Sequence, residues 1–437
     1  MTWLQRYRVR HYFRNAIWIW PLLSMLAALV AVRILHGIED EMGWQSSLHP
    51  STAQAVLGTM ASSMFTFMVF VSSALLVAVQ LASSQMTPRI IAIVFRDRIT
   101  RLSLVVFVFA FTFTLASLVR IGTTVPPLTT HLAAYSCLVS LGVFLYLIDH
   151  VGKALRPSGA LWAVAWQGRE VIESVYPRLI SASPNAKLQC TDVFVGQALR
   201  TLPNRRDGVV LAFDIQGLVS LAQHADCVLE LVPQVGDFVA VGDPLFRIFV
   251  GGATLPEEAL YQFVAVGQER TLEQDPTFAF RIMVDIASKG LSPGINDPTT
   301  AVLALDQIHH LLRDVGQRHL DDERVRDQAG ELRLLYRTPG WEDFVQLAIT
   351  EIRHFGGTSI QVNRRLRALL ENLIQTLPEE RTVLLRQELK LLHRTAERCF
   401  AEPEDRALAG ISDLQGVGGK QGRKPAHSKE ELQCQPR

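Results

Sequence analysis

The chain has 437 residues, and its 43 Lys and Arg nearly balance its 42 Asp and Glu. This balance argues against a nucleic-acid-binding protein, because such proteins carry a basic excess on one domain. The five cysteines are scattered and form no C-x-x-C pair, which argues against a disulfide framework or a structural zinc site. The hydrophobic excess lies in the first 150 residues, which indicates a membrane region followed by a soluble one.

Four long apolar stretches lie in this first part of the chain. Each has about 18 or more residues, the length that a helix needs to cross ~30 Å of hydrocarbon, and none has a charged side chain near its centre. We therefore predict four transmembrane helices rather than buried helices of a soluble protein, at residues 16–35, 56–82, 102–119 and 128–150. The first is too long for the apolar core of a signal peptide, and no cleavage site follows it, so we expect a retained signal anchor.

The loop charges predict the orientation of these helices. Arginines cluster before the first predicted helix and between the second and the third, whereas the loop 36–55 has neither Lys nor Arg. Positive charge favours the cytoplasmic side of a membrane. We therefore expect both termini, and the whole region after the fourth helix, in the cytoplasm.

The second predicted helix carries a polar stripe. Six residues fall within about 60° of one face at 100° per residue; they are Thr59, Ser62, Thr66, Ser73, Gln80 and Ser84. One interpretation is a pore lining that replaces part of the water around an ion or solute. The other is helix packing, because small and hydroxylated residues let transmembrane helices approach closely. No Asp, Glu or Lys lies in the middle of a predicted helix, which disfavours ion-coupled active transport.

The remaining chain predicts an α+β fold in four parts. They are a linking helix and connection (152–204), a small β-rich module (205–254), a mainly helical region (255–410) and a disordered tail (411–437). The β-rich module has Gly-Asp turns at Gly236–Asp237 and Gly242–Asp243. These turns resemble the hammerhead of biotinyl- and lipoyl-type barrels, and their surroundings resemble regulatory domains beneath some potassium channels. No lysine lies near the turns to carry a cofactor, which excludes attachment chemistry, and Gly-Asp turns are common, so we favour a plain structural module.

The densest cluster of polar and turn residues lies at 269–302. In Asp275–Pro276 and in Asp297–Pro298, an N-cap residue precedes a proline at the first helical position, so each pair predicts the start of a helix. Between them, Arg281, Asp285 and Lys289 are spaced four apart, which predicts two ion pairs on one helix face.

Two interpretations of this hairpin stay open. In the first, side chains that converge near the turn bind a cation, a phosphate or a lipid headgroup, and the free N–H groups after Pro298 favour an anion. The converging residues would be Asp285, Asn296, Asp297, Thr299 and Thr300. In the second, the segment is a structural hairpin with capped helices and ion pairs, which include Asp275 and Arg281.

Four segments of the chain resemble the signature segments of an uncharacterised bacterial membrane-protein family, domain of unknown function 2254. They are LASSQMTPR (81–89), RTLEQDP (270–276), DIASKGLSPGINDPTTA (285–301) and EDFVQLAITEIRHFGG (342–357). They occur in the family's order, and the likeness covers most of residues 10–400. The resemblance implies the architecture above in a bacterial inner membrane. It implies no activity and no catalytic residue.

The motif content and the topology together lead to two functional hypotheses. The sequence has no P-loop, Rossmann, nucleophile-elbow or zincin motif, so we expect no enzymatic activity, metal or cofactor. Four helices are too few to enclose a solute pathway, so we expect a homo-oligomer. The first hypothesis is a channel-like or permeability-controlling protein that its cytoplasmic domain regulates. The alternative is a membrane-anchored sensor or scaffold whose soluble domain binds a protein partner or small ligand.

Overall fold

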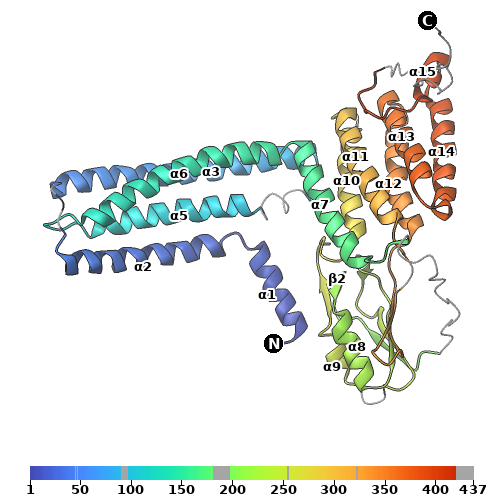
Figure 1. The fold of residues 1–437 in the computed structure, drawn as a ribbon, viewed down its shortest axis with the longest axis horizontal. Coiled ribbons are helices and arrows are strands. Elements are labelled where there is room, and N and C mark those ends of the chain that lie inside the picture. The colour runs from blue at the N-terminus through green and yellow to red at the C-terminus, as the bar shows by residue number, and fades with distance from the viewer. Residues whose placement is uncertain are drawn as a thin grey trace, which may run out of the picture.

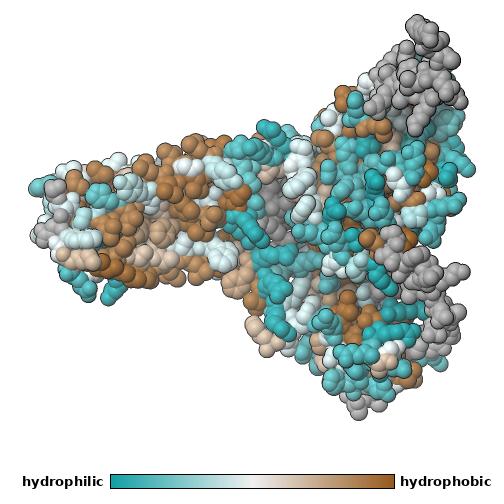
Figure 2. All heavy atoms as spheres, in the orientation of Figure 1, coloured by the Kyte–Doolittle hydropathy of each residue, from teal (hydrophilic) through white to brown (hydrophobic). Residues whose placement is uncertain are grey.

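The computed structural model describes residues 1–44, 46, 48–89, 97–180, 197–252, 255–320 and 323–419. Figure 1 shows an arm of long helices that projects from a region of shorter helices and sheets. Four helices of the arm are long and apolar enough to cross a membrane: α2 (Ile19–Met42), α3 (Pro50–Gln85), α5 (Arg98–Val119) and α6 (Pro127–Ala154). Hydrophobic residues gather on the arm in Figure 2, whereas the rest is mostly hydrophilic. The four predicted apolar helices are therefore present.

Helix α5 is the centre of the arm, because it packs against α2, α3 and α6. The buried contacts use small residues such as Ala28 and Ala133 together with Leu57 and Phe113. Small side chains let membrane helices approach closely. Two buried hydroxyls of α5 bond within their own helix, Ser103 to the carbonyl oxygen of Ile99 at 2.9 Å and Ser117 to that of Phe113 at 2.7 Å. The Thr114 hydroxyl instead lies 3.4 Å from the Cys137 sulfur of α6.

Helix α2 ends at Met42, well beyond its predicted end at residue 35. Its last turns contact the start of α6 through Glu39. Glu39 of α2 is only 2% exposed. Its Oε1 accepts hydrogen bonds from the N–H groups of Leu128 at 2.5 Å and Thr129 at 3.0 Å, and its Oε2 accepts one from the Thr129 hydroxyl. A carboxylate at a helix start satisfies free N–H groups and complements the helix dipole.

Helix α3 is much longer than a membrane crossing requires. Its 36 residues correspond to ~54 Å at 1.5 Å per residue, against the ~30 Å of a hydrocarbon core. Val79, Ala82 and Met86 pack in one hydrophobic cluster with residues of the shorter helices outside the arm. The prediction of 56–82 therefore covers only the middle of a helix that continues into the neighbouring region.

The chain after the arm begins with α7 and contains one large helical core. The helices are α7 (Pro157–Val175), α10 (Pro276–Gly290), α11 (Pro298–Gly316), α12 (Trp341–Phe355), α13 (Ile360–Thr376), α14 (Glu379–Cys399) and α15 (Pro403–Ala409). We call the cluster formed by α7 and α10–α14 the helical core. A Cβ at Gly168 of α7 would lie 2.7 Å from the Cβ of Ala279 and 3.1 Å from Leu311, so glycine permits α7 to pack closely there.

Two small sheets lie beyond the helical core in Figure 1. Their strands are β1 (Arg200–Pro203), β2 (Gly208–Phe213), β3 (Val228–Leu231), β4 (Phe238–Val239), β5 (Pro244–Phe249), β6 (Val264–Gly267), β7 (Glu323–Arg326) and β8 (Leu332–Tyr336). The larger sheet has the order β1-β5-β3-β8-β7, with β3 and β8 parallel, and the smaller has the order β4-β2-β6. Strand structure therefore extends beyond 205–254. The sheets pack with α8 (Ile215–His224) and α9 (Glu257–Leu260).

The two Gly-Asp turns have the same geometry. Gly236 and Gly242 both adopt φ +95°, where a side chain would be strained. Each following aspartate accepts a hydrogen bond from a backbone N–H three residues before it: Asp237 from Gln234 at 3.0 Å and Asp243 from Ala240 at 2.8 Å. Both turns also bond to other segments, because the Gly236 N–H donates to the Val210 carbonyl oxygen at 2.8 Å and the Gly242 N–H donates to that of Asn204 at 2.9 Å. Each turn connects strands of different sheets, so neither forms a hairpin.

The start of the predicted disordered tail is instead held against α13. Arg364 is 1% exposed, and its guanidinium donates hydrogen bonds to the carbonyl oxygens of Ile411, Gly418 and Gly419 at 2.7–3.1 Å. These bonds satisfy an otherwise costly buried cation. The rest of the predicted tail, residues 420–437, lies outside the described residues.

Candidate functional site

The polar stripe lies on the exposed face of α3. All six of its residues are exposed, from Thr59 to Ser84. The buried residues of α3, such as Leu57, Met64 and Val71, point ~165° away at 100° per residue. The stripe therefore faces away from the helices against which α3 packs in its own chain.

Several stripe hydroxyls bond to their own helix. The Thr59 hydroxyl donates to the Ala55 carbonyl oxygen at 2.8 Å, and the Thr66 hydroxyl donates to that of Ser62 at 3.1 Å. Such bonds lower the cost of placing a hydroxyl in a membrane, but each oxygen keeps acceptor capacity. The face can therefore contact another polar surface without rearrangement of this chain.

The stripe ends beside the helical core rather than inside the bundle. Gln80 follows Val79, which packs in the helical core together with Ala82 two residues later. Because adjacent residues share one turn of a helix, Gln80 lies at the level of the helical core. Gln80 thus belongs to the end of α3 that leaves the arm.

An ion-pair network joins the end of α3 to the helical core, and we call it the junction cluster: Arg89, Arg281, Asp285 and Glu351. Arg89 pairs with Asp285 of α10. Asp285 Oδ1 also accepts from Arg281 Nε at 2.6 Å. Arg281 in turn donates to both carboxylate oxygens of Glu351 on α12 at 2.7 Å each. This fork-to-carboxylate geometry is the strong form of an ion pair.

The charges of the junction cluster affect one another. The hydrogen bonds from Arg281 lower the pKa of Glu351. Burial lowers the pKa of Arg89, and the positive charges of Arg281 and Arg270 lower it further. Positive charge is therefore concentrated near Arg89, and Asp285 compensates part of it.

A second contact ties the same two elements one turn further along α10. The Lys289 ammonium donates a hydrogen bond to the carbonyl oxygen of Ser83, near the end of α3, at 3.2 Å. The sequence predicted an ion pair between Lys289 and Asp285. In the structure Asp285 instead pairs with Arg89 and Arg281. The predicted Arg281–Asp285 pair is present at 2.5 Å.

The SPGINDP turn forms a capped hairpin. Asp297 accepts hydrogen bonds from the N–H of Thr300 at 3.1 Å and from its hydroxyl at 2.6 Å, so it caps α11 as predicted. Asn296 is exposed at φ +50°, and Thr299 is also exposed. Within the described chain, no hydrogen bond or ion pair joins Asp285 to these turn residues. The predicted cluster is therefore divided in the structure. Asp285 forms ion pairs with Arg89 and Arg281, whereas Asp297 and Thr300 form the cap of α11.

Asp275 caps α10 and also holds the preceding loop. It is 1% exposed, and its Oδ1 accepts from the Phe278 N–H at 3.1 Å and from the Thr277 hydroxyl at 2.5 Å. Its Oδ2 lies 3.6 Å from Arg270 Nε, and Arg270 donates to the Gly236 carbonyl oxygen at 2.9 Å. Burial raises the pKa of Asp275. This arrangement ties a Gly-Asp turn of the smaller sheet to the start of α10.

The N-terminal helix α1 (Trp3–Asn15) is attached to the same loop. Arg14 lies 3.1 Å from Glu273 and His11 lies 3.6 Å from it. Burial alone raises the pKa of Glu273, but hydrogen bonds from His11 and Tyr7 and the charge of Arg14 together lower it to about 2. Helix α1 leads into α2, and α10, which Asp275 caps, binds Arg89 after the end of α3. The loop 270–276 therefore contacts two helices, α1 and α10, that connect with the arm.

The four segments with the family resemblance therefore meet at one place, the attachment of α3 to the helical core. Sequence reasoning missed Arg89 and Glu351 as site residues. The signal that could have found them is their position, because each is a charged residue inside one of the four segments.

Comparison with known protein families matches residues 14–372 to predicted membrane proteins of domain of unknown function 2254. The chain belongs to this family. The chain is similar to uncharacterized protein Rv1290c of Mycobacterium tuberculosis and to uncharacterized protein Mb1321c of Mycobacterium bovis. Each is 26% identical over 425 residues, which cover 92% of this chain and 80% of the relative. No solved structure matches the chain.

Proposed function

We propose that this protein is a homo-oligomeric, channel-like membrane protein in which α3 of each subunit faces a shared axis. The observation that carries this proposal is the polar stripe on the exposed face of α3, opposite its packed face. In a lone subunit, this face would place hydroxyls against acyl chains, which offer them no hydrogen-bond partner. A closed oligomer brings identical faces together around one axis, where the stripe can meet its copies or water.

The attachment of α3 supports regulation by the region outside the arm. Helix α3 is one uninterrupted helix from Pro50 to Gln85. Arg89 and Ser83 bind α10 through Asp285 and Lys289. A ligand or partner that shifts α10 therefore has a direct mechanical route to the stripe.

The loop charges support an orientation with both termini in the cytoplasm, and the family supports a bacterial inner membrane. Reporter fusions at residues 95 and 430 should report the cytoplasm, and a fusion at residue 45 should report the periplasm. A cytoplasmic signal at residue 45 would contradict this orientation.

Cross-linking tests whether α3 faces the axis. Thr66→Cys, in a background in which the native cysteines are replaced by serine, should form cross-linked oligomers with a short bismaleimide in native membranes. Leu141→Cys is the control, because Leu141 is 52% exposed but lies on α6. Cross-linking through Leu141 but not through Thr66 would contradict an axis lined by α3.

Liposome flux tests whether the oligomer conducts. Gln80→Glu should shift ion selectivity toward cations, because each subunit then adds a negative charge to the ring. Gln80→Leu should reduce flux while native mass spectrometry still detects the oligomer. Gln85→Leu is a matched control, because Gln85 is also an exposed glutamine of α3 but points ~140° away from Gln80.

The same measurements decide between the two functional hypotheses. If wild type and Gln80→Glu form oligomers but pass no ion or small solute at any voltage tested, the channel proposal fails. The alternative, a membrane-anchored sensor or scaffold, then becomes the better explanation of the region outside the arm.

A further inference from the structure

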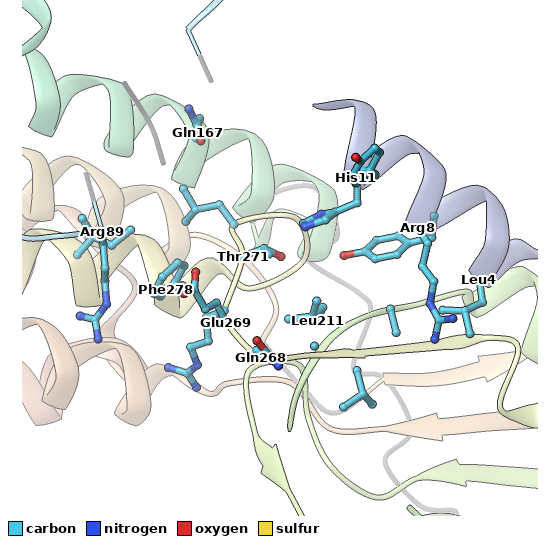
Figure 3. A pocket seen from close by; sticks show the side chains of 18 of the residues that line it. Leu4, Arg8, His11, Arg89, Gln167, Leu211, Gln268, Glu269, Thr271 and Phe278 are labelled. Atoms are coloured by element: carbon cyan, nitrogen blue, oxygen red, sulfur yellow. The ribbon is translucent and has the colours of Figure 1, made fainter. Parts of the chain in front are cut away.

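A large cavity lies where α1, the end of α3 and the smaller sheet meet. Its volume is about 890 Å³, near the upper end of the ~300–1,000 Å³ that small-molecule sites span. Figure 3 shows Arg8 and Arg89 on opposite sides of this space, with His11, Thr271, Glu269 and Gln268 between them. None of the residues singled out in the sequence as site residues lines this cavity.

The cavity is positioned at the root of the arm. His11 comes eight residues before Ile19, the first residue of α2, and Pro88 comes three residues after Gln85, the last residue of α3. Both therefore lie close to the ends of apolar helices that are long enough to cross a membrane. An occupant of the cavity has direct access to the headgroup layer of a bilayer that surrounds these helices.

The charges around the cavity favour an anion. Three arginines line it, Arg8, Arg89 and Arg270, against the single carboxylate of Glu269. Arg89 and Arg270 already bind Asp285 and Asp275, so they contribute positive potential more than free hydrogen bonds. Arg8 is exposed and has no ion-pair partner within the described chain. Its guanidinium can bind a phosphate with two parallel hydrogen bonds.

Much of the remaining lining is apolar or aromatic, beside a few polar side chains such as Gln167 and Thr271. It includes Leu4, Tyr12, Leu272, Phe278 and Ile282. An isolated phosphate ion would fill little of this volume and would leave these side chains in contact with water. A molecule with an anionic head and an apolar part satisfies both halves of the lining.

We propose that this cavity binds the headgroup of an anionic phospholipid, with Arg8 as its main phosphate contact. The glycerol and first acyl carbons then lie along the apolar residues of α1 and α10. Such a lipid touches α1, the residues after α3 and α10 together, so it stabilises the arrangement around the junction cluster. This inference does not depend on whether the protein conducts.

The like charges near Arg89 agree with this assignment. Burial and the charges of Arg281 and Arg270 lower the pKa of Arg89. A bound phosphate would offset this repulsion, because it adds negative charge to the same wall. An anion is thus favoured by the potential of the wall as well as by Arg8 itself.

The test compares two arginines of the same helix. Arg8→Gln removes the proposed contact, whereas Arg10→Gln removes the same charge ~200° around α1, outside the cavity lining. Both residues are exposed, so neither substitution removes packing. The probe is dioctanoyl phosphatidylglycerol, added to the full-length protein in detergent, with binding measured by native mass spectrometry and thermal shift.

We expect Arg8→Gln to raise the Kd for this lipid about tenfold, the usual size of a lost hydrogen bond to a charged group. Arg10→Gln should change the Kd less than twofold, and Arg8→Lys should retain part of the affinity. Equal losses in the Arg8 and Arg10 variants would overturn the proposal, because they would indicate general surface attraction.

Two further probes test the chemistry of the occupant. Dioctanoyl phosphatidylcholine has the same chains without net charge and should bind at least tenfold more weakly. Glycerol phosphate carries the anionic head without chains and should also bind at least tenfold more weakly. Equal affinity for the choline lipid would overturn the anionic assignment, equal affinity for glycerol phosphate would indicate a free phosphate compound, and absence of binding to wild type would remove the site.

Discussion

Asp285→Asn is the most informative perturbation of the junction cluster, because it removes one charge while the side chain keeps its size. Asp285 is the only carboxylate in the junction cluster that binds both arginines, Arg89 and Arg281. Its side chain is 18% exposed, whereas those of Arg281 and Arg89 are 28% and 46% exposed. The substitution therefore breaks one partly buried pair and one largely exposed pair.

The magnitude follows from these exposures. Removal of one partner from a fully buried pair costs about 3–5 kcal/mol, whereas exposed pairs contribute about 0–1 kcal/mol. The Arg281–Asp285 pair lies between these limits, and the Arg89–Asp285 pair lies near the lower one. We expect the free energy of unfolding to fall by about 2 kcal/mol, with additional repulsion between the two arginines.

Thermal unfolding in detergent measures this loss. Glu258→Gln is the control, because the side chains of Glu258 and its partner Arg205 are 73% and 47% exposed, so this substitution should leave stability nearly unchanged. A double-mutant cycle with Arg281→Gln should show coupling above about 0.5 kcal/mol. Equal effects of Asp285→Asn and Glu258→Gln, or additive effects in the cycle, would refute the junction cluster as an energetic link.

Three other predictions follow from local contacts. Asp297→Ala removes the cap of α11 and should cost about 1 kcal/mol in thermal unfolding; no change in stability would contradict the cap. Gly168→Ala should cost about 1–3 kcal/mol, whereas Gly142→Ala, whose Cβ meets nothing within 4 Å, should not. The pKa of Glu273 is lowered to about 2, so its stabilisation is present above its ordinary pKa and is lost as pH falls toward 2. Wild type and Glu273→Gln should therefore differ in melting temperature at pH 6 and converge near pH 2, and a constant difference would contradict this.

Features that depend on neighbouring residues could be predicted from the sequence. Each Asp-Pro pair starts a helix because the cap, the proline and the free N–H groups lie within four residues of one another. The Asp214 cap of α8 is a further example, with its Oδ1 accepting from the Gly217 N–H at 3.1 Å. The apolar arm helices were predictable for a similar reason, since length and composition alone define them.

Features that depend on distant contacts could not be predicted in this way. Arg89 and Asp285 are 196 positions apart, and a periodic pattern contains no information about which partner each will find. Helix α3 shows the same limit, because hydropathy falls at Ser83 and Ser84 although the helix continues to Gln85. The parallel pairing of β3 with β8 likewise joins strands about 100 residues apart.

The length of α3 has a mechanical consequence. A rigid rod of ~54 Å that is held at its Arg89 end acts as a lever, and a rotation of 5° about that end displaces Pro50 by roughly 5 Å. The displacement is comparable to one helical turn, although the movement at the pivot is far smaller. At the other end, Gln54 donates a hydrogen bond to the Ile121 carbonyl oxygen at 3.1 Å. Such a rotation would break this bond or move the loop after α5 with it. The largest strain therefore falls on the Gln54–Ile121 contact, at the end of α3 far from Arg89.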